Sequence, residues 1–496
     1  MQRVLDLQVE LWRKIASSNR CLVSADKPEL QQALLDFDSS FPDSFFSIEE
    51  QAVLRTARTS PYLLIGDFHT LPAAQLQAAR WLRRIKPRYL AVEIFSSNMQ
   101  ESVDRWSASS KPASALLEEL SFARNWPCIS PRGYLELLES ARELGCRILA
   151  AEHPQHFSEN PPGLEKRDAH FAQYLKQHGR GCTAMLVGDV HLRPTALPSR
   201  LGNATVVLHQ NQAKYHFLMT RQGMEPPGYI QLAPRRYCWQ GVHPLLVEES
   251  CLRSYSREED AYLPQPAEWF AELAGRIGGL LEIEASPIPT LLTTHDPEQR
   301  SLLATIAKKP KQARRLIAAL RIRGSEPISK ETIVLHETGT NHVSEALGRW
   351  LLSTHIPETR QRSNGLLQVV ADTRLESAGF LCSILVNPLR RPKPLLFYRD
   401  ALGIEAQYHK LGDLARRLEE GISLGTLLGT EKWPKTISPE GMLLTRVVGQ
   451  SLGSRLRSIW LQSDEKRGQV LELLTLPLES KGDLQGFSER LQSILS

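Results

Sequence analysis

The sequence predicts an α/β fold, in which an open, mainly parallel β-sheet with flanking helices precedes a mostly α-helical C-terminal region. Two observations support this prediction. Apolar runs with strand character alternate with helical periodicity over residues 55–225, as in βαβ units. Helical periodicity then dominates from Pro266 onward. We therefore expect a helical lead-in over residues 1–54, an α/β domain over residues 55–225 and a helical region of unknown role over residues 226–496.

Five apolar runs have the length and composition of strands, at residues 62–65, 89–94, 147–151, 185–187 and 205–209. Helix signals stand between them. Thr70 is expected to cap the first of two clear helices, with Pro72 in its first turn. Ser130 is expected to cap the second, with Pro131 as its first residue and Gly145 at its end.

The composition is that of an ordinary globular protein, with 42% hydrophobic and 23% charged residues in 496. The net charge of +5 does not by itself indicate nucleic-acid binding. No apolar run approaches the ~18 residues of a membrane span, and the N-terminus is amphipathic rather than a secretory signal. Seven scattered cysteines without a CxxC pair are typical of reduced thiols. These features predict a cytoplasmic protein.

The same word, G-D-x-H, ends two of the apolar runs, at residues 66–69 and 188–191. Glycine lets a chain turn sharply as it leaves a sheet, so Gly66 and Gly188 are expected to make such turns. Open α/β sheets bind ligands at the carboxyl ends of their strands. We therefore expect His69 and His191 to project into one crevice above the sheet.

Other ionisable residues fall at equivalent positions. Glu93 lies within the apolar run YLAVEIF, where a carboxylate is costly unless it is paired or bound. Glu152 and His153 follow the run RILAA at the end of another expected strand. Asp67 and Asp189 each stand two residues before a histidine and are expected to orient its imidazole.

Three kinds of site remain open for these residues. Two histidines and a carboxylate, here His69, Glu93 and His191, are a suitable ligand set for zinc, manganese or iron. The same set can act as general acid and base without a metal. Haem ligation through His or Tyr is the third alternative.

Five segments of the chain resemble the ChaN-like branch of the superfamily that contains ChaN-like, TraB-like and Tiki-like proteins. They are YLLIGDFHT, YLAVEIFSSNMQESVDRW, GYLELLESARELGCRILAAEHP, KRDAHFAQYL and MLVGDVHLRP, in that order over roughly residues 55–210. Erythromycin-esterase-like enzymes share the general pattern. Three further segments, APRRYCWQGVHPLLVEESCL, TNHVSEALGRWLL and GFLCSILVNPLRR, are similar to the extended, helical form of bacterial ChaN-like proteins.

The resemblance implies a bacterial protein of haem or iron handling that binds haem or a divalent metal ion. By motif, His69, Glu93 and His191 carry over as the site, and Arg167 matches a helix arginine that faces it. The Tiki-like, TraB-like and esterase-like relatives imply a rival function, a metal-dependent hydrolase with metal-bound water as its nucleophile. A third alternative is an interaction scaffold with a vestigial site. A homodimer is a possible form, and nucleic acid is not an expected partner.

The chain departs from the family pattern in two respects. Asp67 stands where family members usually have Glu, and its shorter side chain reaches less far. The lipoprotein signal of outer-membrane ChaN-like proteins is also missing. Tyr134 stands near the start of an expected helix, and its place in an apolar stripe assigns it to the core.

Two features lie in the helical region. The basic run over residues 308–323 is expected to form a solvated helix face, with an acidic partner as the alternative; it contains Lys308, Lys309, Lys311, Arg314, Arg315, Arg321 and Arg323. His342 and Glu345 are three residues apart on one face of an expected helix. A bundle-type metal site would need a second Glu-x-x-His pair, so we expect an intra-helix hydrogen bond or a domain contact there.

Overall fold

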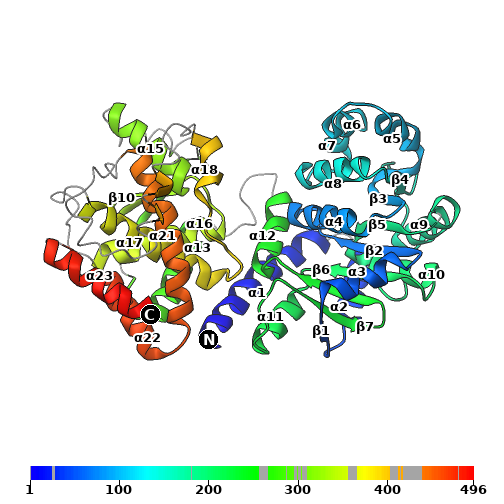
Figure 1. The fold of residues 1–496 in the computed structure, drawn as a ribbon. Helices are drawn as coiled ribbons and strands as arrows, with labels where there is room; N and C mark the ends of the chain where they lie inside the picture. Colours follow the sequence, from blue (N-terminus) through cyan, green and yellow to red (C-terminus); the bar gives the residue numbers. More distant parts are fainter. Residues whose placement is uncertain are drawn as a thin grey trace. The chain divides into compact units, whose positions relative to one another are not determined.

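The computed structural model describes residues 2–24, 28–179, 181–255, 266–285, 287–294, 310–355, 366–402, 438–478 and 480–495, with 296, 299, 303, 411–413, 415 and 416. The chain forms two compact units (Figure 1). The α/β unit comprises Val9–Leu263, and the helical unit comprises Met1–Gln8 together with Pro264–Ser496. No helix within the described ranges is long and apolar enough to cross a membrane.

The α/β unit is built on an eight-stranded sheet in the order β1-β7-β8-β6-β2-β5-β3-β4. All its strands are parallel except β7, which runs against both β8 and β1. The expected α/β fold is thus confirmed, and all five expected strands are present. The strands are β1 (Phe46–Ile48), β2 (Tyr62–Asp67), β3 (Tyr89–Ser96), β4 (Arg147–Glu152), β5 (Thr183–Gly188), β6 (Val206–Gln210), β7 (Gly228–Ala233) and β8 (Arg236–Gln240).

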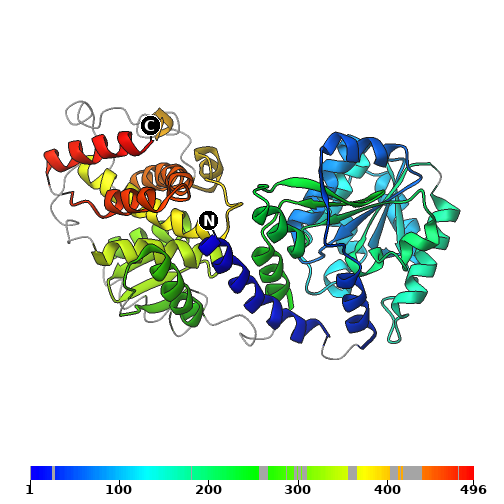
Figure 2. The same cartoon turned by 90° about the horizontal axis from the view of Figure 1, so that it is seen from below.

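Helices cover both faces of this sheet (Figure 2). In β2, Leu63 and Ile65 pack with α3, α4 and α8, whereas Leu64 packs against α9 and α10 on the other face. All three side chains are fully buried, as expected for a strand covered on both sides. The helices of this unit are α2 (Pro28–Ser39), α3 (Glu50–Arg58), α4 (Pro72–Ile85), α5 (Gln100–Ser107), α6 (Ala113–Glu119), α7 (Phe122–Asn125), α8 (Arg132–Glu143), α9 (Leu164–His178), α10 (Leu197–Leu201), α11 (Ala213–Arg221) and α12 (Pro244–Tyr255), with most of α1 (Gln2–Ser24).

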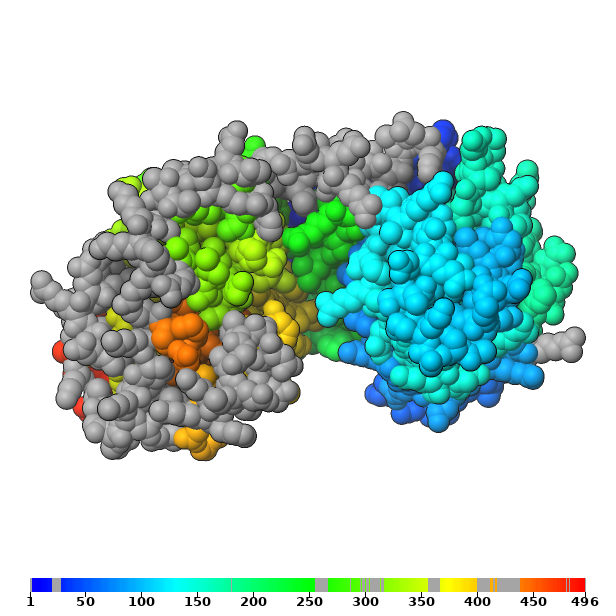
Figure 3. Space-filling model, turned by 90° about the horizontal axis from the view of Figure 1, so that it is seen from above, coloured from blue at the N-terminus to red at the C-terminus, as the bar shows by residue number. Residues whose placement is uncertain are grey.

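Helices α5 to α8 lie together at one end of the α/β unit in Figure 1, and they form much of its blue-to-cyan surface in Figure 3. They follow β3 and precede β4 in the chain. This insertion places Trp126 beside the carboxyl end of β3, where its indole N–H donates to the backbone oxygen of Ile94 at 3.0 Å.

Both expected helix starts are displaced. Leu71, not Thr70, is the N-cap of α4 and makes no side-chain cap; Thr70 instead meets the Ser250 hydroxyl at 3.2 Å. The helix α8 begins at Arg132, one residue later than expected. The φ of +67° at Gly145, two residues beyond the end of α8, confirms the expected helix-ending glycine.

The helical unit contains a small sheet that the sequence analysis did not predict. Strand β11 (Thr332–Leu335) pairs with β10 (Ser325–Ser329) antiparallel and with β9 (Thr290–Thr293) parallel. The expected helical character of this region is confirmed. Its longer helices are α13 (Pro266–Leu281), α15 (Pro310–Arg323), α16 (Thr340–His355), α17 (Leu366–Val386), α18 (Leu395–Leu402), α21 (Pro439–Trp460), α22 (Asp464–Thr475) and α23 (Lys481–Leu495).

The basic run is not simply a solvated face. Arg323 is 8% exposed, and its Nε lies 2.8 Å from a carboxylate oxygen of Glu376. Arg321, in contrast, is exposed as expected. Lys308 and Lys309 lie outside the described residues. The run therefore contributes at least one cation to the interior, because helix α15 packs on α21 there.

Glu345 belongs to the same interior rather than to a metal site. Its carboxylate contacts Arg446 at 2.6 Å and Arg390 at 2.9 Å. Burial lowers the pKa of His342 to about 3, so this imidazole is neutral. Glu345 thus makes a contact within the domain, which was one of the two alternatives expected for it. A hydrogen bond between Glu345 and His342, the other alternative, is not among the described contacts.

Candidate functional site

The two G-D-x-H words lie side by side because β2 and β5 are neighbours, with Asp67 paired to Gly188. Neither Gly66 nor Gly188 has a positive φ in the structure. The expected sharp turn therefore does not explain why glycine stands at these two positions. A Cβ on Gly188 would lie 3.1 Å from His69 Nε2 and 3.4 Å from Glu93 Oε2. A Cβ on Gly66 would lie 2.0 Å from Asp189 Oδ1. Both glycines therefore permit close approach of other side chains.

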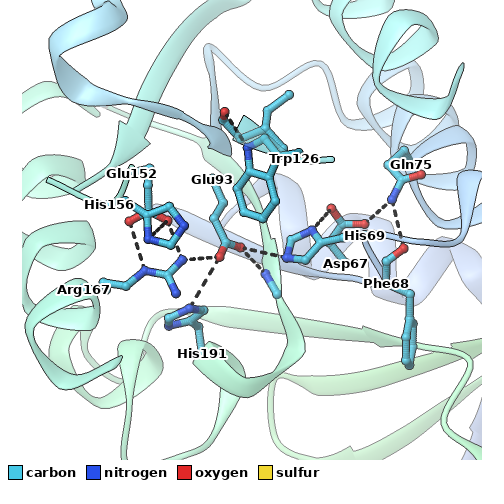
Figure 4. Close-up of polar contacts among 12 residues, drawn as sticks. Asp67, Phe68, His69, Gln75, Glu93, Trp126, Glu152, His156, Arg167 and His191 are labelled. Atoms are coloured by element: carbon cyan, nitrogen blue, oxygen red, sulfur yellow. Dashed lines mark hydrogen bonds and ion pairs between the residues drawn. The ribbon is translucent and has the colours of Figure 1, made fainter. Parts of the chain in front are cut away.

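His69 is held on two sides by acidic side chains (Figure 4). Its Nδ1 lies 3.0 Å from Asp67 Oδ2, which confirms the expected contact between these two residues. The hydroxyl of Tyr134 donates to the same Asp67 oxygen at 2.5 Å and lies 3.0 Å from His69 Nδ1. On the other side, His69 Nε2 lies 3.6 Å from Glu93 Oε2. Tyr134 is buried as expected, but its hydroxyl also belongs to the site.

His191 approaches the other oxygen of Glu93. Its Nε2 lies 3.6 Å from Glu93 Oε1, and its Nδ1 lies 2.6 Å from Asp168 Oδ1. The expectation that Asp189 orients His191 is wrong. Asp189 accepts from Gln212 at 2.7 Å and lies 3.8 Å from His209 Nδ1, on the β6 side of the sheet.

Arg167, from α9, joins the two buried glutamates. Its Nη2 donates to Glu93 Oε1 at 2.5 Å and also to Glu152, which accepts from Nε at 3.1 Å as well. The sequence motif therefore placed Arg167 and Glu152 correctly beside Glu93. His153 does not join them, because its Nδ1 accepts from the backbone N–H of Gln155 and its ring packs on His170.

The pKa values follow from these contacts. Burial alone would lower the pKa of His69, but the carboxylates of Glu93 and Asp67 outweigh it and raise this pKa to about 9. Burial would also lower the pKa of His191, but the contacts with Asp168 and Glu93 outweigh burial and raise this pKa. The pKa of Glu93 is held well below its usual value against burial, with His69 as the largest opposing cause. The His69 imidazole of the ligand-free protein is therefore cationic at neutral pH.

Aromatic side chains surround the accessible part of the site. The side chain of His69 is 23% exposed, whereas those of Glu93 and His191 are 4% and 1% exposed. The Trp126 ring lies 5.3 Å from the His69 ring and 5.7 Å from the His156 ring. Phe157 packs on Trp126 at 5.8 Å. Sequence reasoning missed Asp168, Trp126 and His156, because nothing local to those residues indicates what they contact.

A divalent metal ion does not fit this arrangement. Both oxygens of Glu93 are already engaged, Oε1 by Arg167 and Oε2 by the Gly188 N–H at 2.5 Å. The Arg167 guanidinium supplies a fixed positive charge next to the carboxylate and would repel a second cation. Among the described residues, no group of three or more His, Cys, Asp and Glu side chains is placed to hold a metal ion. The expected metal site at His69, Glu93 and His191 is thus not supported by their contacts.

Haem fits the residues better. Haem is planar and largely apolar, and its iron accepts an imidazole nitrogen. His69 offers the exposed imidazole, with Nδ1 fixed by Asp67 and with Nε2 beyond hydrogen-bond distance of Glu93. The neighbouring rings of Trp126 and Phe157 supply the apolar, aromatic surroundings.

Comparison with known families gives one match. Residues 53–160 match the family described as "Haem-binding uptake, Tiki superfamily, ChaN". The matched segment contains His69, Glu93 and Glu152, and it ends before α9 and the second G-D-x-H word. No curated protein and no solved structure matches the chain. Over residues 53–160 the chain is thus similar to the ChaN-like family of the Tiki superfamily, in agreement with the resemblance that the sequence motifs indicate.

Proposed function

We propose that the α/β unit binds haem beside His69, with the imidazole of His69 as the group that meets it. The family match supports a small-molecule ligand of the haem class. One observation carries the choice of His69: its side chain is 23% exposed, while Glu93 and His191 behind it are almost fully buried. A ligand that enters the site from solvent meets His69 first.

The neighbouring residues each have a part in this proposal. Asp67 and Tyr134 hold His69 Nδ1, so Nε2 would be the ring atom for a ligand. The imidazole is cationic in the ligand-free protein and would have to release its Nε2 proton to solvent on binding. Glu93 is itself fixed by Arg167, and its Oε2 lies 3.6 Å from His69 Nε2. Trp126 offers an aromatic face beside the ring. When bound, haem would supply an iron centre, which the His69 imidazole would hold.

Haem titration tests this proposal. Wild-type protein is expected to shift the Soret band and saturate at one haem per chain. His69→Ala is expected to weaken binding by roughly 100-fold, because it removes the imidazole that the proposal assigns to the ligand. It leaves in place the neighbouring His156, whose side chain is 19% exposed. His178→Ala is the matched control, since His178 is an exposed histidine at the end of α9 that packs on Tyr174. Equal haem affinity in the His69→Ala and wild-type proteins would refute the proposal.

A second candidate function is acid–base hydrolysis without a metal. It is favoured by the Asp67–His69 pair, in which a carboxylate 3.0 Å from Nδ1 orients an accessible imidazole. With a pKa of about 9, His69 carries a proton at neutral pH and acts first as an acid, donating that proton to a leaving group. Glu93, held ionised 3.6 Å from Nε2, stabilises that protonated imidazole.

Turnover distinguishes this candidate from haem binding. Wild-type protein would be incubated with a panel of esters, lactones and peptides in the presence of a chelator. Hydrolysis that is lost in His69→Ala and in Glu93→Gln, but kept in His178→Ala, would establish the hydrolase. A protein that neither binds haem nor turns over any substrate would fit the scaffold alternative.

A further inference from the structure

The helical unit carries two cations on the loop that joins α17 to α18, two helices labelled in Figure 1. Arg391 is exposed, and its Nη1 donates to the backbone oxygens of Pro388 at 3.0 Å and Arg390 at 3.3 Å. Lys393 is half-buried, and its Nζ lies 4.1 Å from the ring centre of Phe397. Within the described ranges, no ion pair joins Arg391 or Lys393 to an acidic side chain. Both cations are therefore open to a negative partner.

Further positive charge lies behind this loop. Arg390 and Arg446 share one buried carboxylate, that of Glu345, at 2.9 Å and 2.6 Å. Burial lowers the pKa of Lys393, and the charges of Arg446 and Arg390 lower it further, against smaller opposing effects of Glu345 and Glu337. Positive charge is thus in excess around Lys393, and a negatively charged surface would be attracted to it.

Helix α18 directs two large apolar side chains away from the core. Leu395 and Tyr398 are 9% and 4% exposed and pack with residues of α21. Leu396 and Phe397 lie on the other side of the helix and are 49% and 53% exposed. The contact of Lys393 with Phe397 joins this apolar pair to the cations of the loop. The resulting basic–apolar surface comprises Arg391, Lys393, Leu396 and Phe397.

The loop is fixed on its neighbours by hydrogen bonds. The backbone N–H of Lys393 donates to Gln450 Oε1 on α21 at 2.9 Å. At the start of the loop, the side-chain amide of Asn387 donates to Asn341 Oδ1 on α16 at 3.1 Å. A surface that is already ordered loses little conformational entropy when it binds a partner.

We propose that the basic–apolar surface attaches the protein to an anionic phospholipid membrane. The cations meet the lipid headgroups, and Leu396 and Phe397 enter the boundary between the headgroups and the acyl chains. An acidic peptide is less suitable, because a bound strand needs a sheet edge and a bound helix needs an apolar groove. The surface is built from a loop and one helix, and the two cavities among the described helices of this unit have other linings. Such attachment requires no membrane-spanning helix and is independent of the proposed haem site.

Co-sedimentation of the full chain with lipid vesicles tests the proposal. Wild-type protein is expected to bind vesicles of phosphatidylcholine with about one third phosphatidylserine, and to bind pure phosphatidylcholine at least ~10-fold more weakly. Sodium chloride at about 0.5 M should weaken the binding to anionic vesicles, because it screens the charges. Equal binding to both kinds of vesicle, or no binding to the anionic ones, would overturn the proposal.

A double variant assigns the charge to the loop. Arg391→Gln with Lys393→Gln is expected to weaken binding to anionic vesicles by roughly 30-fold, because two cations no longer meet the lipid surface. Lys166→Gln with Lys176→Gln is the matched control, since it removes two exposed cations from α9 and leaves the same net charge. This control should bind as the wild type does. An equal loss in both double variants would show that net charge, and not this surface, determines the binding.

A second pair of variants tests the apolar side chains. Leu396→Ser with Phe397→Ser is expected to weaken binding by at least ~10-fold, whereas Phe46→Ser, which changes a 73% exposed phenylalanine on β1, should have no effect. Phe397→Trp keeps an aromatic side chain and covers the case in which the serine variant fails to fold. Relative to wild type, its added fluorescence should shift to the blue on anionic vesicles and be quenched by brominated acyl chains. A vesicle-bound Phe397→Trp protein without this shift would refute insertion.

Soluble polyanions separate a lipid surface from other anionic partners. A polyglutamate peptide and a DNA duplex, each added at the same charge concentration as the anionic lipid, should leave the protein on the vesicles, because neither accepts the apolar side chains. Release by either polyanion would assign the surface to that class of partner and overturn the proposal. Light scattering covers self-association: a wild-type dimer that becomes monomeric in Leu396→Ser with Phe397→Ser would also overturn it.

Discussion

His69 and His191 lie on opposite sides of the Glu93 carboxylate, with each Nε2 3.6 Å from one of its oxygens. Each Nδ1 meets a different carboxylate, Asp67 for His69 and Asp168 for His191. The two G-D-x-H words therefore converge on one buried glutamate. The first histidine remains open to solvent, and the second is sealed inside, so only the first is placed to meet a ligand.

The first prediction concerns metal ions. Wild-type protein is expected to bind no stoichiometric Zn²⁺ or Mn²⁺, because the Arg167 guanidinium already lies against Glu93. Arg167→Ala removes that charge and leaves two buried carboxylates, so this variant is expected to gain at least ~10-fold in affinity for these ions. Calorimetry measures the affinity, and an increase in melting temperature with added metal confirms it. Arg200→Ala, a partly exposed arginine on α10, is the control. A stoichiometric ion bound tightly to wild-type protein would contradict the prediction.

The second prediction concerns the cost of breaking the buried ion pairs. Glu93→Gln is expected to lower the free energy of unfolding by about 3–5 kcal/mol, because Arg167 and the imidazoles lose their central counter-charge. Glu136→Gln breaks an exposed pair with Arg83 and is expected to cost about 0–1 kcal/mol. Urea unfolding compares the two variants. A Glu93→Gln protein as stable as wild type would show that the network is not held by charge.

The third prediction concerns Gly188. A Cβ there would lie 3.1 Å from His69 Nε2, so Gly188→Ala is expected to displace the imidazole by a few tenths of an ångström. Haem affinity should fall by roughly 10-fold, because the nitrogen that meets the ligand has moved. Gly275→Ala, on α13, is the control: nothing lies within 4 Å of its Cβ, and the substitution should stabilise that helix by about 0.5–1 kcal/mol. Unchanged haem affinity in Gly188→Ala would mean that the ligand does not meet His69.

The fourth prediction is a dependence of stability on pH. The rings of His216 and His243 are both fully buried and 4.7 Å apart. Burial lowers the pKa of His216 to about 4. Burial is also the larger cause that holds the pKa of His243 well below its usual value, and the charge of His216 is the smaller one. In the unfolded chain both titrate near 6.5, so the unfolded state takes up more protons below that pH. Their stabilising contribution is complete above pH 6.5 and is lost as the pH falls toward 4.

His69 makes stability depend on pH in the opposite direction, because its pKa is raised and not lowered. Its pKa of about 9 lies above 6.5, so its contribution is complete below pH 6.5 and is lost as the pH rises through 9. Urea unfolding of His216→Leu isolates the first effect. The difference in unfolding free energy between wild type and variant should change by about 1.4 kcal/mol per pH unit between pH 6 and 4.5. His178→Leu, an exposed control, should show a constant difference. A constant difference for His216→Leu as well would show that His216 is not buried in solution.

The α/β fold was predictable because its strands and its helix ends are both marked by the local sequence. Leu63, Leu64 and Ile65 form an apolar run whose members are buried on both faces, and Gly145 marks a helix end by its own conformation. The antiparallel strand β7 and the small sheet of the helical unit were not predicted. These strands are only four to six residues long, and β10 contains Pro327, so their pairing partners determine that they are strands.

The site was predictable in part, and the failure at Asp189 has a clear physical cause. The same word adopts two conformations: Asp67 is the last residue of β2, whereas Asp189 begins a short 3₁₀ helix, η2 (Asp189–Leu192). The first aspartate therefore points at its own histidine, and the second points toward Gln212. Asp168 takes its place from α9, a contact across 23 residues that no local pattern encodes.

The strand order has a consequence for any attempt to isolate the family segment. Strand β5 (Thr183–Gly188) lies between β2 and β3 in the sheet, yet it follows residue 160 in the chain. A fragment of residues 53–160 would keep both flanking strands and lose the one that joins them, along with the Arg167 that neutralises Glu93 and Glu152. The matched segment is thus not a complete folding unit, and a shortened protein would have to continue at least through β8.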